Sequence, residues 1–432
     1  MRTKISISAD SLHSSLTGAA AITDHMADII PTSTFDINAT MSNSTTWWNM
    51  SKMKEEYGHD VVALHSQTPV EYAVPMLGYI GPVFIIFTVI FNTLVVIVLL
   101  KKHMRTSTNV LLTAMAVSDT LTGLVILPWC MYYYSFQNYK QPMSLLWCKI
   151  YQFTEELIPT IFHTASIWLT MSLAIQRYIM VCKTRHAKKW CSMHRVKWGI
   201  VFIYVTSILY NIPRFVDIDF LMVEVPWPMP LEGAWVDKPF KEHCAFQTKS
   251  WVVGIEDIYY NIYYWFRVVC VHFVPCTTLV VLNACLLNAM RKAQQRRKKL
   301  MQENRCSESK KLRDTNCTTA MLIVVVTVFL IVEIPTGIVF IFHILANTFQ
   351  IQIMEVRDMN VVSLTTAFLI ILSYPINFFI YCGMSKQFRN TFKQLFVKGD
   401  GRNSINSTRE REYCTLNGNT IERPECDDVT AL

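Results

Sequence analysis

The sequence is short of charged residues and of glycine. Asp, Glu, Lys and Arg make up only 17% of the chain, whereas a soluble globular domain contains about 25%. There are 13 glycines in 432 residues, and no His-Glu-x-x-His, Gly-x-Ser-x-Gly or phosphate-binding glycine loop occurs. The composition excludes a disordered chain and, with the missing motifs, argues against an enzyme. We therefore predict a protein that is not an enzyme and needs no cofactor.

The apolar residues occur in runs that are long enough to cross a bilayer. A membrane-spanning helix needs about 20 mostly apolar residues. Seven segments qualify, at roughly 75–100, 108–134, 151–180, 197–213, 258–290, 318–345 and 361–382. The fourth is the shortest, and the third and fifth carry charges, so six or eight spans are the alternatives. The predicted fold is an all-α membrane protein with a seven-transmembrane helix bundle.

Basic residues predict which side of the membrane each connection faces, because Lys and Arg favour the cytoplasmic side. The fifth connection, 291–313, holds ten Lys and Arg against two Glu, and the first, third and C-terminal connections are also basic. The N-terminus is therefore predicted outside and the C-terminus inside a multi-pass plasma-membrane protein. The net charge of +8 is carried largely by these loops and indicates no nucleic-acid partner. The predicted regions are an extracellular leader at 1–73, the bundle at 74–383, a membrane-surface helix at 384–397 and a cytoplasmic tail at 398–432.

The leader and two cysteines fit this topology. Asn38, Asn43 and Asn49 each begin an Asn-x-Ser/Thr sequon, which predicts glycosylation outside the cell. Residues 1–30 contain no apolar run typical of a signal peptide, so the first span is expected to act as an uncleaved signal. Cys148 and Cys244 both lie outside in this topology, where an oxidising environment allows a disulfide. We expect this disulfide, and two free thiols are the alternative.

Short motifs occur at regular places in the predicted spans. They are Asn92 in span one, Leu111 to Asp119 in span two, Trp147-Cys148, Gln176-Arg177-Tyr178, Pro275, Pro335 and Asn377 to Tyr381. Together, over about residues 75–396, they resemble the rhodopsin-like, or class A, G-protein-coupled receptors. No single motif carries this resemblance alone.

Departures from the usual pattern of that family point to a narrower group. Gln176 stands where the family usually has Asp, and Glu333 stands where it usually has an aromatic residue two positions before the span-six proline. Span seven lacks the proline of the Asn-Pro-x-x-Tyr motif, and Cys148 lies 29 residues before Arg177, about one helical turn further than usual. This combination resembles the insect sex peptide receptor and myoinhibitory peptide receptor group, relatives of the FMRFamide-type receptors.

The resemblance implies a cell-surface neuropeptide receptor. Such a receptor binds an amidated aromatic peptide, such as a myoinhibitory peptide or sex peptide, and activates a heterotrimeric G protein; arrestin is a further implied partner. A receptor for FMRFamide-like or other peptides is the alternative. A secondary transporter is less favoured because the sequence shows no internal repeat. A retinal pigment is disfavoured because residues 361–382 contain no lysine for a Schiff base.

Charged residues inside the predicted spans are candidates for function, because charges at membrane depth usually face the bundle interior. They are Asp119, Glu155, Glu156, Arg177, Arg267 and Glu333. The resemblance implies that Asp119, Ser166 and Asn377 form a polar pocket with sodium as one candidate occupant; a protonated Asp119 is the alternative. The implied switch and G-protein-coupling residues are Gln176, Arg177, Tyr178, Pro335, Asn377 and Tyr381. A neutral Gln176 holds Arg177 more weakly than a carboxylate would, which predicts a less tightly locked resting state.

The outer half of the bundle is predicted to hold the ligand. On span three, Glu156, His163 and Ser166 follow one helix face. The predicted ligand-binding residues are Trp129, Tyr133, Glu156, His163, Tyr264, Arg267, Glu333 and Phe340. Membrane-interface anchoring is the alternative for the aromatic members. Glu333 either pairs with Arg267 or meets a polar group of the ligand, and a cavity of acids and aromatics suits a cationic or amidated peptide.

The segment after span seven has its own pattern. Phe388, Phe392 and Phe396 share one face among basic residues, which predicts a short amphipathic helix on the membrane. The basic fifth connection is expected to contact the lipid bilayer and the G protein. The last residues, Thr430-Ala431-Leu432, fit a strand added to a PDZ domain.

Overall fold

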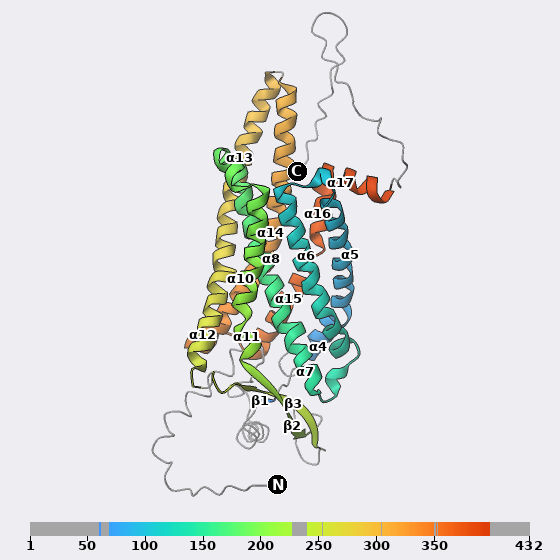
Figure 1. Cartoon of the computed structure of the whole chain (residues 1–432), viewed down its shortest axis with the longest axis vertical. Helices are drawn as coiled ribbons and strands as arrows, with labels where there is room; N and C mark the ends of the chain where they lie inside the picture. Colours follow the sequence, from blue (N-terminus) through green and yellow to red (C-terminus); the bar gives the residue numbers. More distant parts are fainter. Residues whose placement is uncertain are drawn as a thin grey trace, which may run out of the picture.

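A computed structural model describes residues 60–61, 69–226, 240–252, 254–303, 305–349, 351 and 353–397. Within these residues, seven helical spans are long and apolar enough to cross a membrane. In chain order, spans one to seven are Val70–Leu99, Ser107–Ser135, Leu145–Cys182, Met193–Val216, Ile258–Gln302, Thr315–Leu345 and Arg357–Met384. They form one elongated bundle (Figure 1). The predicted fold class and span count are confirmed.

Most spans are built from several helical segments. Span one comprises α4 (Val70–Ala73), η2 (Val74–Ile80) and α5 (Gly81–Leu99), and span two comprises α6 (Ser107–Trp129) and η4 (Cys130–Ser135). Span three comprises α7 (Leu145–Tyr151), η6 (Gln152–Leu157) and α8 (Ile158–Cys182), and span four α10 (Met193–Asn211) and α11 (Pro213–Val216). Span five lies in α12 (Glu256–Phe266), η7 (Arg267–Phe273) and α13 (Val274–Gln302), span six in α14 (Cys306–Phe349), and span seven in α15 (Val356–Ser373) and α16 (Ile376–Met384).

Shorter elements connect the spans. The helical ones are η3 (Lys102–Met104), η5 (Asn138–Lys140), α9 (Thr184–Trp190), α17 (Lys386–Phe392) and η8 (Lys393–Val397). The strands are β1 (Asp60–Val61), β2 (Ile218–Pro226) and β3 (Phe240–Thr248), which form an antiparallel sheet in the order β1-β3-β2. The sequence analysis did not predict these strands. The antiparallel pair of β2 and β3 is called the hairpin below, and the end of the bundle that carries it is called the hairpin end.

Prolines accompany the π-helical segments of four spans. Pro75 lies within η2, Pro128 shortly precedes η4, Pro159 shortly follows η6, and Pro275 shortly follows η7. A proline lacks an N–H and crowds the carbonyl four residues earlier, so the nearby turns widen to recover their hydrogen bonds. A π-helix fits more residues into each turn.

The bundle interior divides into two main apolar regions. At the hairpin end, one cluster is rich in aromatic side chains and includes Trp129, Tyr133 and Tyr264. Towards the other end, a second cluster is mostly aliphatic, with Leu112, Leu169 and other buried residues packed around Tyr381. Many large apolar side chains are instead exposed around the outside of the spans. Soluble monomers rarely expose apolar patches of this extent, so this outer surface fits a lipid environment.

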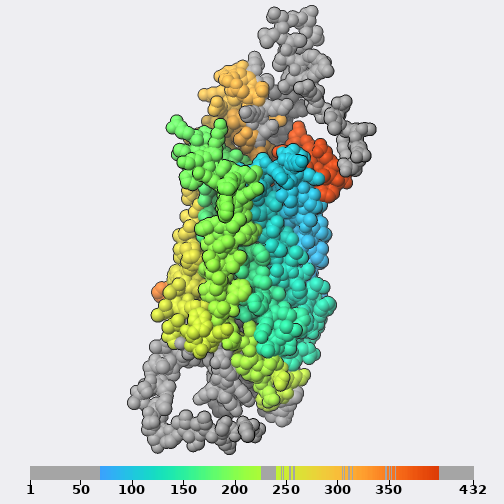
Figure 2. Space-filling view, in the orientation of Figure 1, coloured from blue at the N-terminus to red at the C-terminus, as the bar shows by residue number. Residues whose placement is uncertain are grey.

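The end opposite the hairpin is basic, and we call it the basic end. The adjoining parts of α13 and α14 project there beyond the other spans, as the orange helices in Figures 1 and 2 show. Arg291 and Lys292 lie on this part of α13, together with a later basic run. Nearby, α17 contacts the first connection, because His103 Nε2 lies 2.8 Å from Thr391 Oγ1. Phe388 of α17 is fully buried.

Several predictions lie outside the described residues. They are the three sequons at Asn38, Asn43 and Asn49 and the C-terminal Thr430-Ala431-Leu432. The boundaries of the predicted leader and tail therefore stay predictions. The amphipathic segment after span seven is described, and its first part is α17.

Candidate ligand-binding and signalling site

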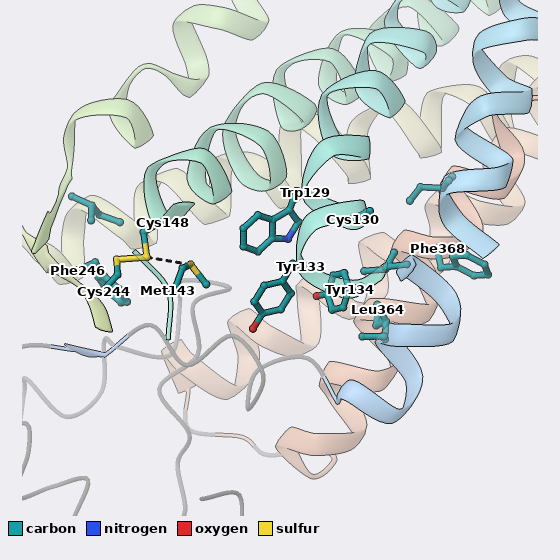
Figure 3. Close-up of a cluster of buried hydrophobic side chains, with 14 of the residues drawn as sticks. Trp129, Cys130, Tyr133, Tyr134, Met143, Cys148, Cys244, Phe246, Leu364 and Phe368 are labelled. Atoms are coloured by element: carbon teal, nitrogen blue, oxygen red, sulfur yellow. Dashed lines mark hydrogen bonds between the residues drawn. A yellow bond between two sulfur atoms is a disulfide. The ribbon is translucent and has the colours of Figure 1, made fainter. Parts of the chain in front are cut away.

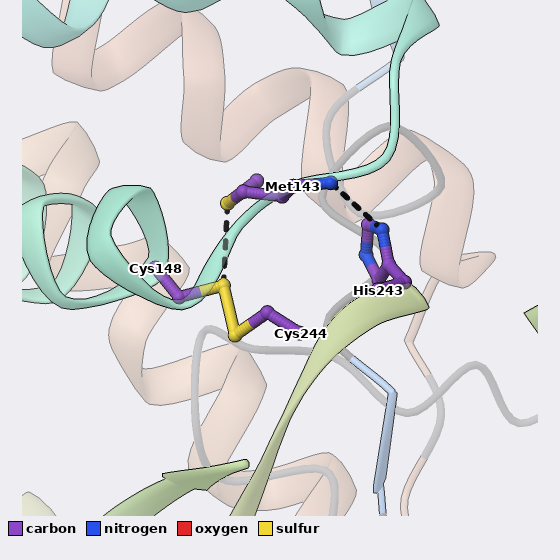
Figure 4. Close-up of a disulfide and its surroundings, with 4 residues drawn as sticks. All are labelled: Met143, Cys148, His243 and Cys244. Atoms are coloured by element: carbon purple, nitrogen blue, oxygen red, sulfur yellow. Dashed lines mark hydrogen bonds between the residues drawn. A yellow bond between two sulfur atoms is a disulfide. The ribbon is translucent and has the colours of Figure 1, made fainter. Parts of the chain in front are cut away.

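A disulfide fixes the hairpin to span three. Cys148 in α7 is bonded to Cys244 in β3, across a sequence separation of 96 residues (Figures 3 and 4). This confirms the predicted pairing. Two backbone contacts reinforce it: Cys244 N donates to Met143 O at 3.1 Å, and Met143 N donates to His243 Nδ1 at 3.0 Å. The hairpin is therefore held rigidly against the start of span three.

Aromatic side chains fill the bundle beneath the hairpin. Trp129 is stacked on Tyr133 (Figure 3), with ring centroids 4.7 Å apart. The ring centroid of Tyr151 in span three lies 4.9 Å from that of Trp129. The structure thus brings the two predicted ligand residues of span two together. Both are buried, and the indole Nε1 of Trp129 has no hydrogen-bond partner in the part of the chain that is described.

A buried network of charges joins spans three and four to the hairpin. Arg214 of α11 donates to Asp217 Oδ2 and also lies 3.4 Å from Glu156 Oε2. Its guanidinium is 5.7 Å from the ring centroid of Tyr260 in span five. Glu156 is therefore already paired within the protein. The neighbouring Glu155 has one buried oxygen with no partner among the described residues.

A second polar cluster joins spans three, five and six. Glu333 is 1% exposed and lies between two histidines. Its Oε1 is 3.1 Å from His163 Nε2, and its Oε2 is 3.5 Å from His272 Nδ1. The pairing with Arg267, one of the two roles suggested for Glu333, is not found among the described residues. The basic groups within 4 Å of its carboxylate are the two histidines, and Glu333 Oε2 makes no hydrogen bond there.

Arg267 lies beside this cluster and is held differently. Its guanidinium lies over the ring of Phe340, 4.5 Å from the ring centroid. The ring of His272 is also stacked on Phe340, with centroids 5.1 Å apart. No hydrogen bond or ion pair joins Arg267 to any other residue that the structure describes. Tyr264, about one turn earlier on span five, is buried, and its hydroxyl has no partner in the described chain.

A polar cavity lies deeper in the bundle. Ser166 Oγ donates to Asp119 Oδ1 at 2.8 Å, and Asn377 lines the same cavity. His163 and Glu333 line it as well, so the histidine cluster and the Asp119 cluster share one space. Carboxylate, hydroxyl and amide oxygens suit a hard cation such as sodium. Among the described residues, however, no group of three or more His, Cys, Asp or Glu side chains is arranged to hold a metal ion.

The predicted switch residues lie towards the basic end. Gln176 is buried, and its Oε1 accepts a hydrogen bond of 3.2 Å from Thr108 of span two. The Nε of Arg177 is buried without a partner in the described residues. No hydrogen bond or ring contact joins Arg177 to Tyr381 in this part of the structure. Tyr381 instead packs near Phe388 of α17, with ring centroids 5.8 Å apart.

Three residues in these clusters were missed by the sequence analysis. Arg214 and Asp217 lie just beyond the predicted end of span four at residue 213, so they were not counted among the membrane charges. His272 lies inside span five, three residues before Pro275, but the count covered only Asp, Glu, Lys and Arg. A search that included histidine and a few residues beyond each span would have found all three.

The fold and these clusters are those of a seven-transmembrane receptor. The chain matches the family described as serpentine type 7TM GPCR chemoreceptor Srw over residues 79–399, and it belongs to this family of G-protein-coupled receptors. It is 42% identical over 380 residues to the sex peptide receptor of Drosophila melanogaster, which covers 87% of this chain and 81% of that relative.

Two further relatives are similar over most of the bundle. Sex peptide receptor-related protein 2 of Caenorhabditis elegans is 36% identical over 327 residues, which covers 74% of this chain and 71% of that relative. The FMRFamide receptor of Drosophila melanogaster is 26% identical over 323 residues, covering 71% of this chain and 51% of that relative. The resemblance to these receptors that the sequence motifs indicated is confirmed.

Proposed function

We propose that this protein is a plasma-membrane neuropeptide receptor that binds an amidated aromatic peptide and activates a heterotrimeric G protein. The observation that carries the proposal is the 42% identity with the Drosophila sex peptide receptor over most of both chains. The peptide is proposed to be of the myoinhibitory type, with sex peptide as a further candidate. Nucleotide exchange on the G protein is then the output, and the receptor itself catalyses no reaction on its ligand.

The orientation follows from the chemistry of the two ends. The disulfide between Cys148 and Cys244 lies at the hairpin end, and disulfides persist in oxidising compartments. The projecting parts of α13 and α14 carry the basic residues that favour the cytoplasmic side. These observations support an N-terminus outside and a C-terminus inside. Glycosylation of the leader, and binding of arrestin and a PDZ protein by the tail, are proposed with this orientation.

The ligand is proposed to enter at the hairpin end and to act on the polar clusters below it. Trp129, Tyr133, Tyr264, Arg267 and Phe340 are the proposed contacts near the entrance. Glu156, His163 and Glu333 are also proposed ligand-binding residues, and their internal contacts with Arg214 and His272 make them responsive to movement of neighbouring spans. A shift of span six would change the contacts of Glu333 with spans three and five together.

The signal is proposed to continue through the shared cavity to the basic end. His163 and Glu333 line the same cavity as Asp119 and Asn377, so a change in one cluster alters the surroundings of the other. Gln176, Arg177, Tyr178, Pro335, Asn377 and Tyr381 are the proposed switch and coupling residues. Because Arg177 has no ion pair among the described residues, it is free to meet a G protein without first losing a carboxylate partner.

The test is nucleotide exchange on a G protein in membranes that contain the full-length receptor. A panel would hold amidated tryptophan-bearing peptides, sex peptide and FMRFamide, with each sequence also made in scrambled form. Exchange that rises with an amidated tryptophan peptide, but not with its scrambled form, is the expected result. An Arg177→Ala receptor should bind that peptide and fail to stimulate exchange. No response to any peptide would refute the peptide-receptor assignment.

A receptor for FMRFamide-like peptides is the second candidate. The similarity to the FMRFamide receptor of Drosophila melanogaster favours it. The same panel separates the two candidates, because this alternative requires FMRFamide to act at lower concentrations than any tryptophan-bearing peptide.

A further inference from the structure

Arg267 is a cation within span five that has no ion-pair partner among the residues that the structure describes. It begins the π-helical segment η7, nine residues after the first residue of the span. Within the described residues its guanidinium lies over the ring of Phe340, and the carboxylate of Glu156 acts on it only through longer-range electrostatics, without an ion pair or hydrogen bond. Charged side chains at membrane depth are costly and normally pair with an opposite charge or with carbonyl groups. An unpaired guanidinium at this depth therefore needs an explanation.

The acids that could neutralise Arg267 are engaged elsewhere. Glu333 lies within contact distance of His163 and His272. Glu156 lies 3.4 Å from Arg214, which also pairs with Asp217. No carboxylate oxygen in the described residues lies within the 4 Å ion-pairing distance of Arg267. Among the described residues, the buried Arg214 thus has two acidic partners, whereas the half-buried Arg267 has none.

The surroundings of Arg267 leave its hydrogen-bond donors available. Phe340 covers one face of the planar guanidinium, but a guanidinium donates from its edges and not from its faces. Tyr264 lies three residues earlier, on the same side of the helix. Its side chain is 6% exposed, and its hydroxyl has no partner in the described part of the chain. Two unsatisfied donors therefore lie next to each other on span five.

We propose that Arg267 and Tyr264 form a subsite that receives an acceptor oxygen of the peptide ligand, either a side-chain carboxylate or the carbonyl of the C-terminal amide. The inference rests on the proposed function as a peptide receptor and adds the chemistry of one contact. An arginine edge matches two acceptor oxygens side by side, and hydrogen bonds that involve a charge are roughly twice as strong as neutral ones. The Tyr264 hydroxyl adds a third donor.

This subsite changes the expected character of the ligand. The sequence analysis counted Glu156 and Glu333 as acids available to a cationic peptide. Both have basic internal partners, whereas the cation Arg267 has no carboxylate partner in the described part of the chain. An oxygen acceptor on the peptide is therefore required for full affinity, whatever cationic or amide groups the peptide also carries.

The first part of the test uses the receptor without ligand. Arg267→Met removes the donors and the charge but keeps a long side chain over Phe340, and Arg214→Met is the matched control. The melting temperature of the full-length receptor in detergent should stay equal or rise for Arg267→Met, because an uncompensated charge is removed. The melting temperature should fall for Arg214→Met, because Glu156 and Asp217 then lose their positively charged partner. An equal fall in both variants would overturn the proposal, since Arg267 would then have an internal partner.

The second part measures peptide potency. The probe is the amidated tryptophan-bearing peptide that gives the strongest nucleotide exchange with the wild-type receptor. Arg267→Met should weaken it by about 10- to 100-fold, the loss expected for a hydrogen bond to a charged group, and Tyr264→Phe by about fivefold. Arg267→Lys keeps the charge but loses the paired donors of the guanidinium. It should therefore recover only part of the potency lost in Arg267→Met.

Peptide variants then identify the source of the acceptor. Each Asp or Glu of the probe is changed to Ala, and in a separate peptide the C-terminal amide is replaced by hydrogen. The effect of Arg267→Met should vanish with the one peptide that lacks the acceptor, which identifies a side-chain carboxylate or the terminal carbonyl. A potency loss that is the same for every peptide would overturn the subsite. A wild-type receptor that no peptide activates would refute the peptide-receptor function, while the melting comparison would still decide whether Arg267 is unpaired.

Discussion

The two ends of the bundle hold their charged residues in opposite ways. Near the hairpin end, Glu156, Arg214 and Asp217 form a network across spans three and four and the start of β2. Towards the basic end, Arg177 has no ion pair among the described residues, and Gln176 turns to Thr108 of span two. The difference suggests that the hairpin end is a rigid frame around the ligand, whereas the basic end is held loosely enough to open towards a G protein.

Removing the disulfide should have the largest effect on this contrast. Cys244→Ser frees the hairpin from span three and releases a loop closed across 96 residues. For a loop of this size the expected loss is about 4–5 kcal/mol of stability. The melting temperature of the receptor in detergent and its affinity for the peptide on cells should both fall. Cys130→Ser, at a buried free cysteine, is the control and should retain binding. Unchanged peptide binding in Cys244→Ser would contradict a rigid frame.

Removing the carboxylate of Glu333 should have the next largest effect. Glu333→Leu leaves His163 and His272 buried without their shared acceptor. The expected cost is about 3 kcal/mol of stability, as for a broken buried pair. Thermal melting would measure it. The triple variant with His163→Leu and His272→Leu should recover part of the loss, because no unsatisfied polar group is then left. No recovery would mean that the cluster is not a coupled unit.

Two adjacent acids allow a closely matched test of the charge network. Glu156→Gln removes one partner of Arg214 and should cost about 2 kcal/mol. Glu155→Gln should cost little, because one of its oxygens is buried without a partner in the described residues. The measurement is the melting temperature of each variant, which should fall more for Glu156→Gln than for Glu155→Gln. Equal losses would contradict the assignment of Glu156 as the structural acid.

The smallest predicted effect is at the basic end. Gln176→Asp supplies the carboxylate that can hold Arg177, which should stabilise the resting state by about 1 kcal/mol. Nucleotide exchange without peptide should then fall by about fivefold. Gln176→Asn shortens the side chain in the same way without adding charge, so it should leave this basal exchange near the wild-type level. Unchanged basal exchange in Gln176→Asp would show that the basic end is not loosely held.

The sequence predicted the fold well because the membrane imposes simple requirements. Seven apolar runs and the placement of Lys and Arg were enough for the span count and the expected topology. The partner of Cys148 could be predicted because Cys244 was expected on the same outer side. The strands β2 and β3 were not predicted, because the segment between spans four and five carries no membrane signal. Their position also depends on contacts with span three, which the sequence does not show.

The contacts within the site were harder to predict. Residue spacing placed Glu156 and His163 on one face of span three, but it does not specify which residue of another span lies opposite. Arg267 was therefore suggested as one of two possible partners of Glu333, the other being a polar group of the ligand, whereas His163 and His272 are the residues within contact distance of it. The role of Arg214 depends on where span four ends, and helix ends are poorly defined by sequence.

We propose that the cluster of His163, Glu333 and His272 passes the effect of the peptide from the hairpin end to the basic end. The most direct measurement compares Glu333→Gln with the wild type for peptide binding and peptide-stimulated nucleotide exchange in the same membranes. We expect Glu333→Gln to bind the peptide with a reduced affinity that saturating peptide overcomes, while exchange at saturating peptide no longer rises above the basal rate. Weakened binding with full stimulation at saturating peptide would contradict the proposal, because Glu333 would then act only as a ligand contact.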